Sequence, residues 1–350
     1  MSKIGSAFLV RSDRLLAIAF VLMVTVVLAG ISTGETQASF TGTSTNPTSQ
    51  TITMTVQPPA SQNATTSAAA GLVNLSWAAT PTAPGTGHTL TYLVLRGPVG
   101  GPYAQIGSTA TLAYSDTPSA DGTYEYVIEA RVTGGGSFTS GNSAAKSGIS
   151  DRIAPAMSIT CNSAACSAGW YNATVSVTVS GTDAGTGMGS VTRNVDGAGQ
   201  TSTSGSTATF NVSGENAGHT VAYFGTDAAG NASSGTNQTV KIDLTAPTAP
   251  TALTSATGSN GAPVTVDLTW TAGTDALSGV VGYTVRWVQS NACPAATPAN
   301  YPSSAAIGVV TSYSISGLTN NLNYCAYLTT TDNAGNVSAA SAVTGPTKAK

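Results

Sequence analysis

The stretch VTVDLTW, at residues 264–270, alternates apolar with polar side chains and ends on a tryptophan. Alternation of this kind puts every second side chain on the same face of a β-strand, so that one face is apolar and the other polar. The stretch VNLSW, at residues 73–77, repeats the pattern 193 positions earlier (270 − 77). We therefore predict that Trp77 and Trp270 are each buried in the core of a β-sandwich, and that they lie in different domains.

The composition agrees with an all-β chain. Of the 350 residues only 8% are charged. Helices would then lack the charged residues that keep their outer faces soluble, whereas strands with threonine-rich outer faces need few. The length suits two to three domains of ordinary size. The formal net charge is −3, and no basic cluster follows the N-terminus, so we expect no binding of nucleic acid.

The N-terminus carries an export signal or a membrane anchor. Residues 15–31 form an apolar run preceded by Arg11 and Arg14. As a helix this run would be about 25 Å long, slightly short of a hydrocarbon core of ~30 Å. Positive charge before the run places the N-terminus in the cytoplasm and the rest of the chain outside, and small residues ending at Ala38 offer a cleavage site. We predict that residues 1–38 are a signal peptide or, if uncleaved, a single-pass membrane anchor.

The stretch ASFTGTSTNPTSQTITM, at residues 38–54, resembles the mature start of exported actinobacterial and bacillary proteins of the camelysin/TasA type. This resemblance implies export and residence on the cell surface, in an extracellular matrix or in the medium. We expect residues 39–57 to form an extended segment. Within it TITMTV, at residues 51–56, has the alternation of a strand.

Two further aromatic strands follow each tryptophan strand. LTYLVLRG and GYTVRW come next, and GTYEYVIEARV and LNYCAYLTTT then carry Tyr124 and Tyr324 near their starts. This order of aromatic strands resembles the fibronectin type III sandwich, and SISGLTNNLNYCAYLTTTDNAGNVS, at residues 314–338, matches that family closely. The resemblance implies that the hydroxyl groups of Tyr124 and Tyr324 bond to the backbone a few residues upstream. It assigns fibronectin type III sandwiches to residues 58–150 and 248–350.

Residues 151–247 resemble the bacterial Ig-like modules that occur in tandem on surface proteins. The matching features are a Gly-Trp-Tyr start at residues 169–171 and a Thr-Asp-x-x-Gly-Asn close at residues 226–231. Prolines 155, 247 and 250 mark the boundaries, because proline cannot donate into the middle of a sheet. We therefore predict three tandem β-sandwiches after an N-terminal hydrophobic helix, in line over about 100 Å.

The phrase TDAAGNAS, at residues 226–233, recurs as TDNAGNVS at residues 331–338. In each copy an apolar strand must reverse within a few residues. An aspartate side chain can cap such a turn, and a glycine can adopt the left-handed backbone that closes a bulged hairpin. We predict a hairpin connection at both places. Its residues are Asp227, Gly230 and Asn231 in the first copy and Asp332, Gly335 and Asn336 in the second.

A calcium site at the domain junctions is the alternative interpretation of the same phrase. Its oxygen donors would be Asp227, Asn231, Asp243, Asp332 and Asn336. Calcium takes about 6 to 8 oxygen ligands, several of them from carboxylates, and the sequence indicates only one or two acids at each junction. We therefore expect no metal and no cofactor.

Four cysteines in an exported chain predict two disulfides, for which three pairings are possible. We expect Cys161 to pair with Cys166 around a small surface loop, and Cys293 with Cys325, because cross-pairing would staple two domains together. In immunoglobulin domains the core cysteine comes two residues after the corner tyrosine. Since Cys325 comes only one residue after Tyr324, its bridge should lie outside the core. A zinc site would need further cysteine or histidine ligands, which the sequence does not supply at suitable spacing.

The sequence offers few groups for catalysis. Its only histidines are His88, in a Gly/Pro-rich loop, and His219, at the start of a strand. Neither accompanies a nucleophile elbow, so we expect both to be solvated residues at strand ends. Glu125 and Glu129 share an outward strand face, where they would serve solubility rather than glycoside hydrolysis. We expect no enzyme activity.

Three functions are then compatible with the sequence. The leading one is a non-catalytic, exported cell-surface protein that acts as a spacer or adhesion scaffold and contacts proteins or cell-wall glycans. The second is a fibre or matrix subunit that self-assembles when residues 39–56 add as a strand to a neighbouring molecule. The third is a carbohydrate-binding accessory protein, for which Trp170, Trp287 and Tyr327 are the candidate exposed aromatics.

Overall fold

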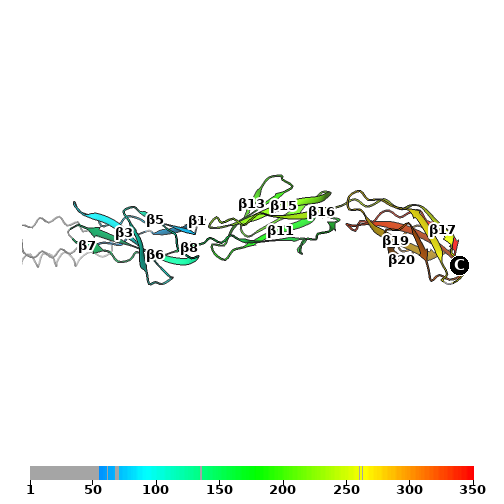
Figure 1. Ribbon diagram of the computed structural model, residues 1–350, viewed down its shortest axis with the longest axis horizontal. Coiled ribbons are helices and arrows are strands. Elements are labelled where there is room, and N and C mark those ends of the chain that lie inside the picture. The colour runs from blue at the N-terminus through cyan, green and yellow to red at the C-terminus, as the bar shows by residue number, and fades with distance from the viewer. Residues whose placement is uncertain (1–54, 61, 68–70, 135, 260, 262) are drawn as a thin grey trace, which may run out of the picture. The chain divides into compact units, whose positions relative to one another are not determined.

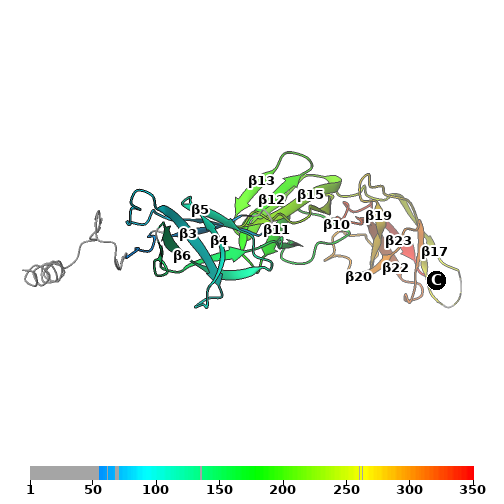
Figure 2. The ribbon, with the colours of Figure 1, turned by 60° about the vertical axis from the view of Figure 1, so that its left-hand side comes forward.

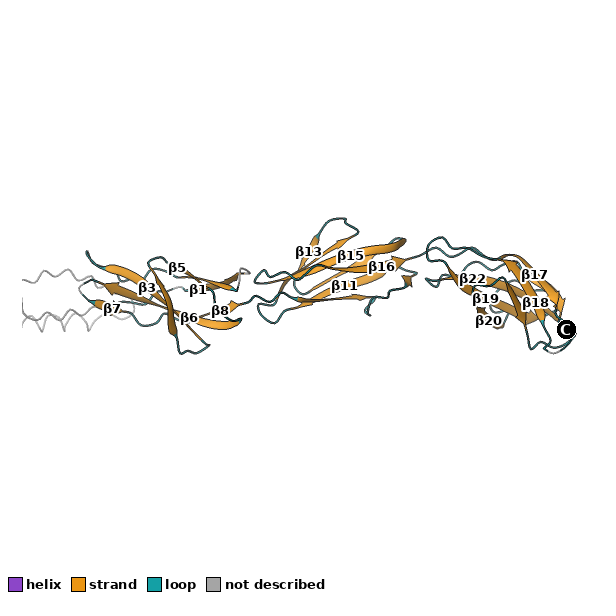
Figure 3. Cartoon of the chain, viewed as in Figure 1, coloured by secondary structure: helices purple, strands orange, loops and turns teal. Residues whose placement is uncertain are grey.

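The structure is a computed structural model that describes residues 55–350 with short gaps (Figure 1). The positions left out within this range are 61, 68–70, 135, 260 and 262. The described residues form strands and no helix, as Figure 3 shows, so the all-β prediction is confirmed. Within the described residues no helix is long and apolar enough to cross a membrane. The predicted signal or anchor, its helix and most of the extended segment lie outside the described residues.

Three pairs of sheets follow one another along the chain, and all three share one plan. A three-stranded sheet takes two early strands and one middle strand, and a larger sheet takes the others. This is the plan of Ig-like and fibronectin type III sandwiches. In the first pair the sheet orders are β1-β2-β5 and β4-β3-β6-β7, with β8 beside β6. Their bounds are β1 (Asn63–Ser67), β2 (Leu72–Ser76), β3 (Thr89–Gly97), β4 (Ala104–Thr109), β5 (Ala113–Asp116), β6 (Gly122–Thr133), β7 (Ser137–Thr139) and β8 (Lys146–Ser150).

The second pair has the orders β14-β11-β9 and β10-β16-β15-β12-β13. Figure 2 shows β13, β12 and β15 as neighbours, and both pairings are antiparallel. The short strand β10 runs parallel to β16 at the edge of the larger sheet. The bounds are β9 (Ala156–Cys161), β10 (Trp170–Tyr171), β11 (Val175–Thr182), β12 (Met188–Val195), β13 (Thr201–Ser204), β14 (Thr207–Val212), β15 (Asn216–Asp227) and β16 (Thr236–Ile242).

The third pair has the orders β17-β18-β21 and β20-β19-β22-β23. A sandwich is what the fibronectin type III resemblance implies for the C-terminal part, and here its two sheets have three and four strands. The bounds are β17 (Thr251–Thr257), β18 (Val266–Thr271), β19 (Val280–Gln289), β20 (Ser303–Ile307), β21 (Ser312–Ile315), β22 (Asn323–Asp332) and β23 (Thr344–Lys348).

Valines hold the middle sandwich together. Val175, Val177 and Val179 alternate along β11 and are fully buried, while the polar residues between them are partly exposed. They belong to one apolar cluster with Val221 and Tyr223 of β15, in the other sheet. Each fully buried valine contributes about 1.5–3 kcal/mol relative to an exposed one. A one-residue shift of β11 would expose all three valines, so the alternation also fixes the register.

The other two sandwiches are built around aromatic pairs. Trp77 and Trp270 are only 5% and 6% exposed. Each meets a tyrosine edge-on, with ring centroids 5.6 Å apart for Trp77 and Tyr92 and 5.4 Å apart for Trp270 and Tyr283. Edge-on aromatic pairs add about 0.5–1.5 kcal/mol to the free energy gained by burial. The side chains of Trp77 and Trp270 therefore lie between the sheets of their sandwiches.

The described chain divides into two compact units. The first takes the described part of Met1–Ala64 with Leu75–Tyr114 and Glu125–Ser147, and the second takes Thr65–Asn74, Ser115–Tyr124 and Gly148–Lys350. The second unit contains every residue from β9 to β23, including all the loops that carry the repeated aspartates. The boundaries predicted at residues 58, 151 and 248 stay predictions.

Candidate functional site

The side chain of Asp227 closes the loop that follows β15. Its Oδ1 atom accepts hydrogen bonds from the backbone N–H groups of Gly230, at 2.6 Å, and Asn231, at 2.7 Å. Gly230 has a φ of +99°, in the region that favours glycine. Thr226 and Ala232 then face each other as an antiparallel bridge. The chain thus reverses on an aspartate cap and a left-handed glycine.

The loop that follows β22 is built in the same way. Asp332 accepts hydrogen bonds from the backbone and side-chain N–H groups of Asn336, both at 2.8 Å. Gly335 has a φ of +91°. Asp332 is 1% exposed and Asp227 is 3% exposed. Because these carboxylates are buried, each must be balanced by the hydrogen bonds of its surroundings.

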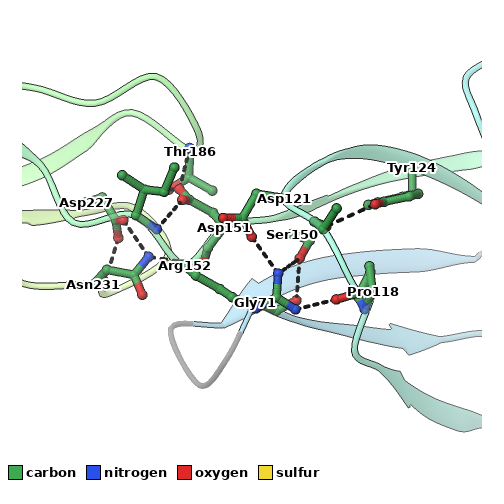
Figure 4. Close-up of polar contacts among 12 residues, drawn as sticks. Gly71, Pro118, Asp121, Tyr124, Ser150, Asp151, Arg152, Thr186, Asp227 and Asn231 are labelled. Atoms are coloured by element: carbon green, nitrogen blue, oxygen red, sulfur yellow. Dashed lines mark hydrogen bonds and ion pairs between the residues drawn. The ribbon is translucent and has the colours of Figure 1, made fainter.

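A third buried carboxylate, Asp151, lies directly after β8 and reaches the loop between β11 and β12 (Figure 4). Its Oδ2 atom accepts hydrogen bonds from the N–H group of Thr186, at 2.7 Å, and from the Thr186 hydroxyl, at 2.8 Å. Burial by itself would raise the pKa of Asp151, but these bonds and one from the N–H of Ile153 outweigh burial and lower its pKa. Asp151 is therefore ionised at neutral pH although it is only 1% exposed.

The asparagine of each repeated phrase connects its loop to the linker before the sandwich. The Nδ2 group of Asn231 donates to Oδ2 of Asp227 at 2.7 Å and to the backbone carbonyl of Asp151 at 3.1 Å (Figure 4). In the second copy, Nδ2 of Asn336 donates to the carbonyl of Asp243 at 2.9 Å. A hairpin turn alone does not require these contacts.

Asp243, directly after β16, takes the place in the second copy that Asp151 takes in the first. It is fully buried. Its Oδ1 atom accepts from the N–H of Thr245 at 3.1 Å, and its Oδ2 atom accepts from the N–H of Ser278 at 3.0 Å. Ser278 lies in the loop between β18 and β19, which matches the position of Thr186 between β11 and β12.

The loop between β11 and β12 also supplies Asp183, and the loop between β18 and β19 supplies Asp275. Three carboxylates therefore come together at each of the two places. Carboxylate oxygens of Asp151, Asp183 and Asp227 all lie within 4.8 Å of one another. The same is true of Asp243, Asp275 and Asp332. We call the first set aspartate group one and the second set aspartate group two. The expectation of only one or two acids at each junction is therefore wrong.

Sequence reasoning missed Asp151, Asp183 and Asp275 because they lie in loops that the fold brings together from distant parts of the chain. A usable signal was present. The first two members of each group are 32 residues apart (183 − 151 and 275 − 243), and each linker aspartate opens an Asp-x-x-Ala-Pro phrase. The chemistry of both groups is that of oxygen ligands and hydrogen-bond acceptors. Both groups consist of aspartates alone and contain no cysteine or histidine.

Arg152 turns away from group one although it neighbours Asp151. Its guanidinium forms an ion pair with Asp121 at 2.6 Å and donates to Oγ of Ser150 at 3.1 Å and to the carbonyl of Pro118 (Figure 4). The positive charge nearest in sequence to group one is therefore already engaged elsewhere.

Both corner tyrosines bond to backbone upstream. The hydroxyl of Tyr124 donates to the carbonyl of Ala120 at 2.9 Å. The hydroxyl of Tyr324 instead accepts from the N–H of Thr319 at 3.1 Å. Each bond joins the start of the strand to the turn before it.

The structure contains disulfides between Cys161 and Cys166 and between Cys293 and Cys325. The loop that the first bridge closes, residues 162–165, is exposed as expected, although Cys161 itself is 2% exposed and packs in the core of the middle sandwich. Cys325 is fully buried as well. It lies outside the main core of its sandwich, but in a second apolar cluster with Tyr301. The loop before β20 creates this cluster by covering the outer face of the sheet.

Tyr327 belongs to the same second cluster, so its proposed role as an exposed sugar-binding aromatic is wrong. It is 2% exposed and meets Tyr301 edge-on, with ring centroids 4.8 Å apart. Trp170 and Trp287 are half-buried, and Trp287 packs partly against the main core. The described residues therefore provide only two of the three expected aromatics for a glycan.

His219 is not solvated, contrary to expectation. It is 7% exposed, and its Nδ1 lies 2.6 Å from Oδ2 of Asp196, while its Nε2 lies 3.1 Å from the carbonyl of Gly214. Burial alone would lower the pKa of His219, but the bonds to Asp196 and Gly214 together with the charge of Asp196 raise it. The same bond to His219, with one from the N–H of Thr220, lowers the pKa of Asp196. His88 is exposed just before β3.

We expect the pair of His219 and Asp196 to stabilise the middle sandwich only within a pH window. The folded-state pKa of His219 is raised, so its contribution is complete below about pH 6.5 and is lost as the pH rises through that raised value. The folded-state pKa of Asp196 is lowered, so its contribution is present above about pH 4 and is lost as the pH falls through that lowered value. Because the Asp196 side chain is 40% exposed, the effect should not exceed about 1 kcal/mol.

Denaturant melts of wild type and His219→Gln from pH 5 to pH 9 would measure this effect. The difference in unfolding free energy should be largest near pH 5 to 6 and should shrink at alkaline pH. The exposed His88→Gln is the matched control and should follow wild type. A constant difference between His219→Gln and wild type across the whole range would contradict the expectation.

Glu125 is more than a solubilising residue. It accepts hydrogen bonds from the N–H of Gly100 at 2.8 Å and from the hydroxyl of Tyr103 at 2.7 Å. The bond from Gly100 and then the bond from Tyr103 lower the pKa of Glu125. The bond to Glu125 raises the pKa of Tyr103. The carboxylate therefore fixes the turn between β3 and β4.

No protein-family model matches the chain, and no curated protein matches it. Among solved structures, the FN1–FN3 domains of chicken CNTN1 align over 82% of this chain and 97% of that chain, at 14% identity and a TM-score of 0.33. Domains A168–A170 of titin align over 84% of this chain and 94% of that chain, at 12% identity and a TM-score of 0.40. At these values the similarities carry no argument about function.

Proposed function

We propose that the protein is a non-catalytic, exported scaffold of tandem β-sandwiches that acts as a spacer or adhesion protein at the cell surface or in the medium. One observation carries the proposal. The buried acids Asp151, Asp227, Asp243 and Asp332 accept hydrogen bonds from the loops themselves. These groups fix the loops at the ends of the sandwiches, which is a structural role and fits a scaffold.

Export is supported by independent features. Two disulfides are typical of proteins from oxidising compartments. The apolar run at residues 15–31 and the camelysin/TasA-like stretch at residues 38–54 agree with export to the surface or the medium. We propose contacts with proteins or cell-wall glycans through the loops or the edge strands.

The start of the first sandwich bears on the alternative of a fibre subunit. Val56 is 6% exposed. The backbone of the next residue, Gln57, is also held: its carbonyl accepts from the hydroxyl of Thr80 at 2.5 Å, and its N–H donates to the hydroxyl of Thr82 at 2.9 Å. The last residue of the proposed donor strand thus packs within its own molecule, which favours the scaffold.

Deletion of residues 39–54 tests whether the protein is a scaffold or a fibre subunit. It removes most of the proposed donor segment but keeps Val56, which packs in its own molecule. Sedimentation velocity and electron microscopy of the exported protein, with and without the deletion, would report assembly. We expect monomers in both cases. Fibres of wild type that disappear on deletion would instead establish the fibre subunit. Retention of wild type, but not Trp287→Ala, on insoluble cell-wall glycan would establish carbohydrate binding.

A further inference from the structure

We propose that aspartate group one and aspartate group two each bind a calcium ion. All six aspartates lie within the second compact unit. This inference goes beyond the scaffold function and does not depend on it. The metal would join the linker residue before each sandwich to two loops of that sandwich.

The negative charge of aspartate group one is not balanced by a nearby positive side chain of the described chain. Asp151 and Asp227 are 1% and 3% exposed, and a carboxylate oxygen of each lies within 4.8 Å of one from Asp183. Buried charges in proteins are normally paired or coordinate metals. In the described part of the chain no lysine, arginine or histidine forms an ion pair with any of the three. Arg152, the nearest candidate in sequence, is held by Asp121 and Ser150 (Figure 4).

Asp183 has one carboxylate oxygen without a partner in the part of the chain that the structure describes. Asp183 uses Oδ1 to accept from the N–H groups of Gly185, at 3.0 Å, and Gly187, at 2.9 Å. Its Oδ2 atom is buried and has no hydrogen-bond partner among the described residues. Leaving a buried acceptor unpaired costs about 1–3 kcal/mol, and more if it is charged. A cation among the three carboxylates would provide the missing partner.

The backbone around group one is shaped for close approach. A Cβ atom at Gly185 would lie 2.3 Å from Oδ2 of Asp151, so any larger residue would push this carboxylate out of its place. Gly185 thereby lets the linker aspartate enter the loop that carries Asp183. The loop sequence TDAGTG, residues 182–187, supplies both the ligand and the space.

Calcium fits this ligand set better than other common metals. The donors are carboxylate oxygens, with backbone carbonyls in the same loops, and calcium takes about 6 to 8 oxygens in flexible geometry. Magnesium demands near-ideal octahedral geometry and keeps several waters. Zinc and copper prefer sulfur or imidazole ligands, and neither group contains cysteine or histidine.

Group two repeats the arrangement. Asp243 is fully buried and Asp332 is 1% exposed. Asp275 accepts from the N–H of Gly279 at 2.6 Å, as Asp183 accepts from the N–H of Gly187. Within each group the linker aspartate takes a hydrogen bond from the loop of its middle member. The same arrangement at two places in the chain predicts two equivalents of calcium per chain.

Titration calorimetry of the full chain with CaCl2, after removal of metal with EGTA, is the test. The titration should reach about 10 mM, because extracellular calcium modules bind at roughly 10⁻⁴–10⁻³ M. We expect two saturable equivalents, and a melting temperature that rises with calcium and falls again with EGTA. Asp183→Asn and Asp275→Asn should each remove one equivalent or weaken it roughly tenfold or more.

Asp267→Asn is the matched control, because it also removes a partly exposed aspartate charge but belongs to neither group. It should bind two equivalents. In EGTA, Asp183→Asn should melt no lower than wild type, because asparagine can still accept from Gly185 and Gly187 while the repulsion between carboxylates is reduced. Asp183→Asn would lower the melting temperature equally with and without calcium if the aspartate were purely structural.

Three results would overturn the proposal. One is the absence of saturable binding up to the highest calcium concentration. Another is binding that survives unchanged in both Asp183→Asn and Asp275→Asn. The third is equal affinity for magnesium, which would mean a diffuse attraction of divalent cations rather than a calcium site.

Discussion

Trp270→Ala should destabilise the C-terminal sandwich by about 3–5 kcal/mol, the range found when a buried large aromatic is truncated. Trp270 is 6% exposed and packs edge-on against Tyr283, so truncation leaves a cavity between the two sheets. Hydrogen exchange followed by mass spectrometry would locate the effect. Peptides from β18 and β19 should exchange much faster, whereas peptides from β11 and β15 of the middle sandwich should be unchanged.

Trp270→Phe is the informative control. The indole N–H of Trp270 has no hydrogen-bond partner among the described residues, so phenylalanine loses ring volume without breaking a bond. Trp270→Phe should lower the free energy of unfolding clearly less than Trp270→Ala does. Exchange in Trp270→Ala that matches wild type would show that the indole does not fill the core.

Removal of the disulfide between Cys293 and Cys325 should produce the second large loss. The cysteines are 32 residues apart, and loop-closure entropy assigns about 3–4 kcal/mol to a bridge of this span. The bridge between Cys161 and Cys166 spans only 5 residues and should contribute about 2 kcal/mol. The double variants Cys293→Ala/Cys325→Ala and Cys161→Ala/Cys166→Ala therefore form a matched pair.

Scanning calorimetry should show the two effects in different transitions, one for the C-terminal sandwich and one for the middle sandwich. Cys293→Ala/Cys325→Ala should lose more unfolding free energy than Cys161→Ala/Cys166→Ala. Because Cys325 is fully buried beside Tyr301 and Tyr327, its replacement also loosens the second apolar cluster. A larger loss for the short-span variant would contradict the entropy argument.

The strands that sequence predicts best are those with strict alternation. The pattern of Val175, Val177 and Val179 is local and has period two, so it determines both the element and its buried face. Trp270 could be assigned to the core for the same reason. The repeated phrase at Asp227 and Asp332 was readable because aspartate and glycine are tied to specific turn conformations.

The features that sequence could not reveal depend on contacts between distant residues. The approach of Asp183 to Asp151 exists only once two loops have folded together. The bond of His219 to Asp196 joins residues 23 positions apart (219 − 196), because β12, which ends just before Asp196, pairs with β15. Tyr301 gave no signal of the second apolar cluster, because its loop carries no periodic pattern and docks through tertiary packing alone.

The burial of Trp77 and Trp270 decides which surfaces can act, because a closed core leaves only loops and edge strands for contacts. Acrylamide quenching of Trp170→Phe/Trp287→Phe would test it directly, since this variant retains only Trp77 and Trp270. Their fluorescence should be quenched several-fold less steeply in the folded protein than in urea. Equal quenching in both conditions would place the two indoles on an open surface and contradict the account.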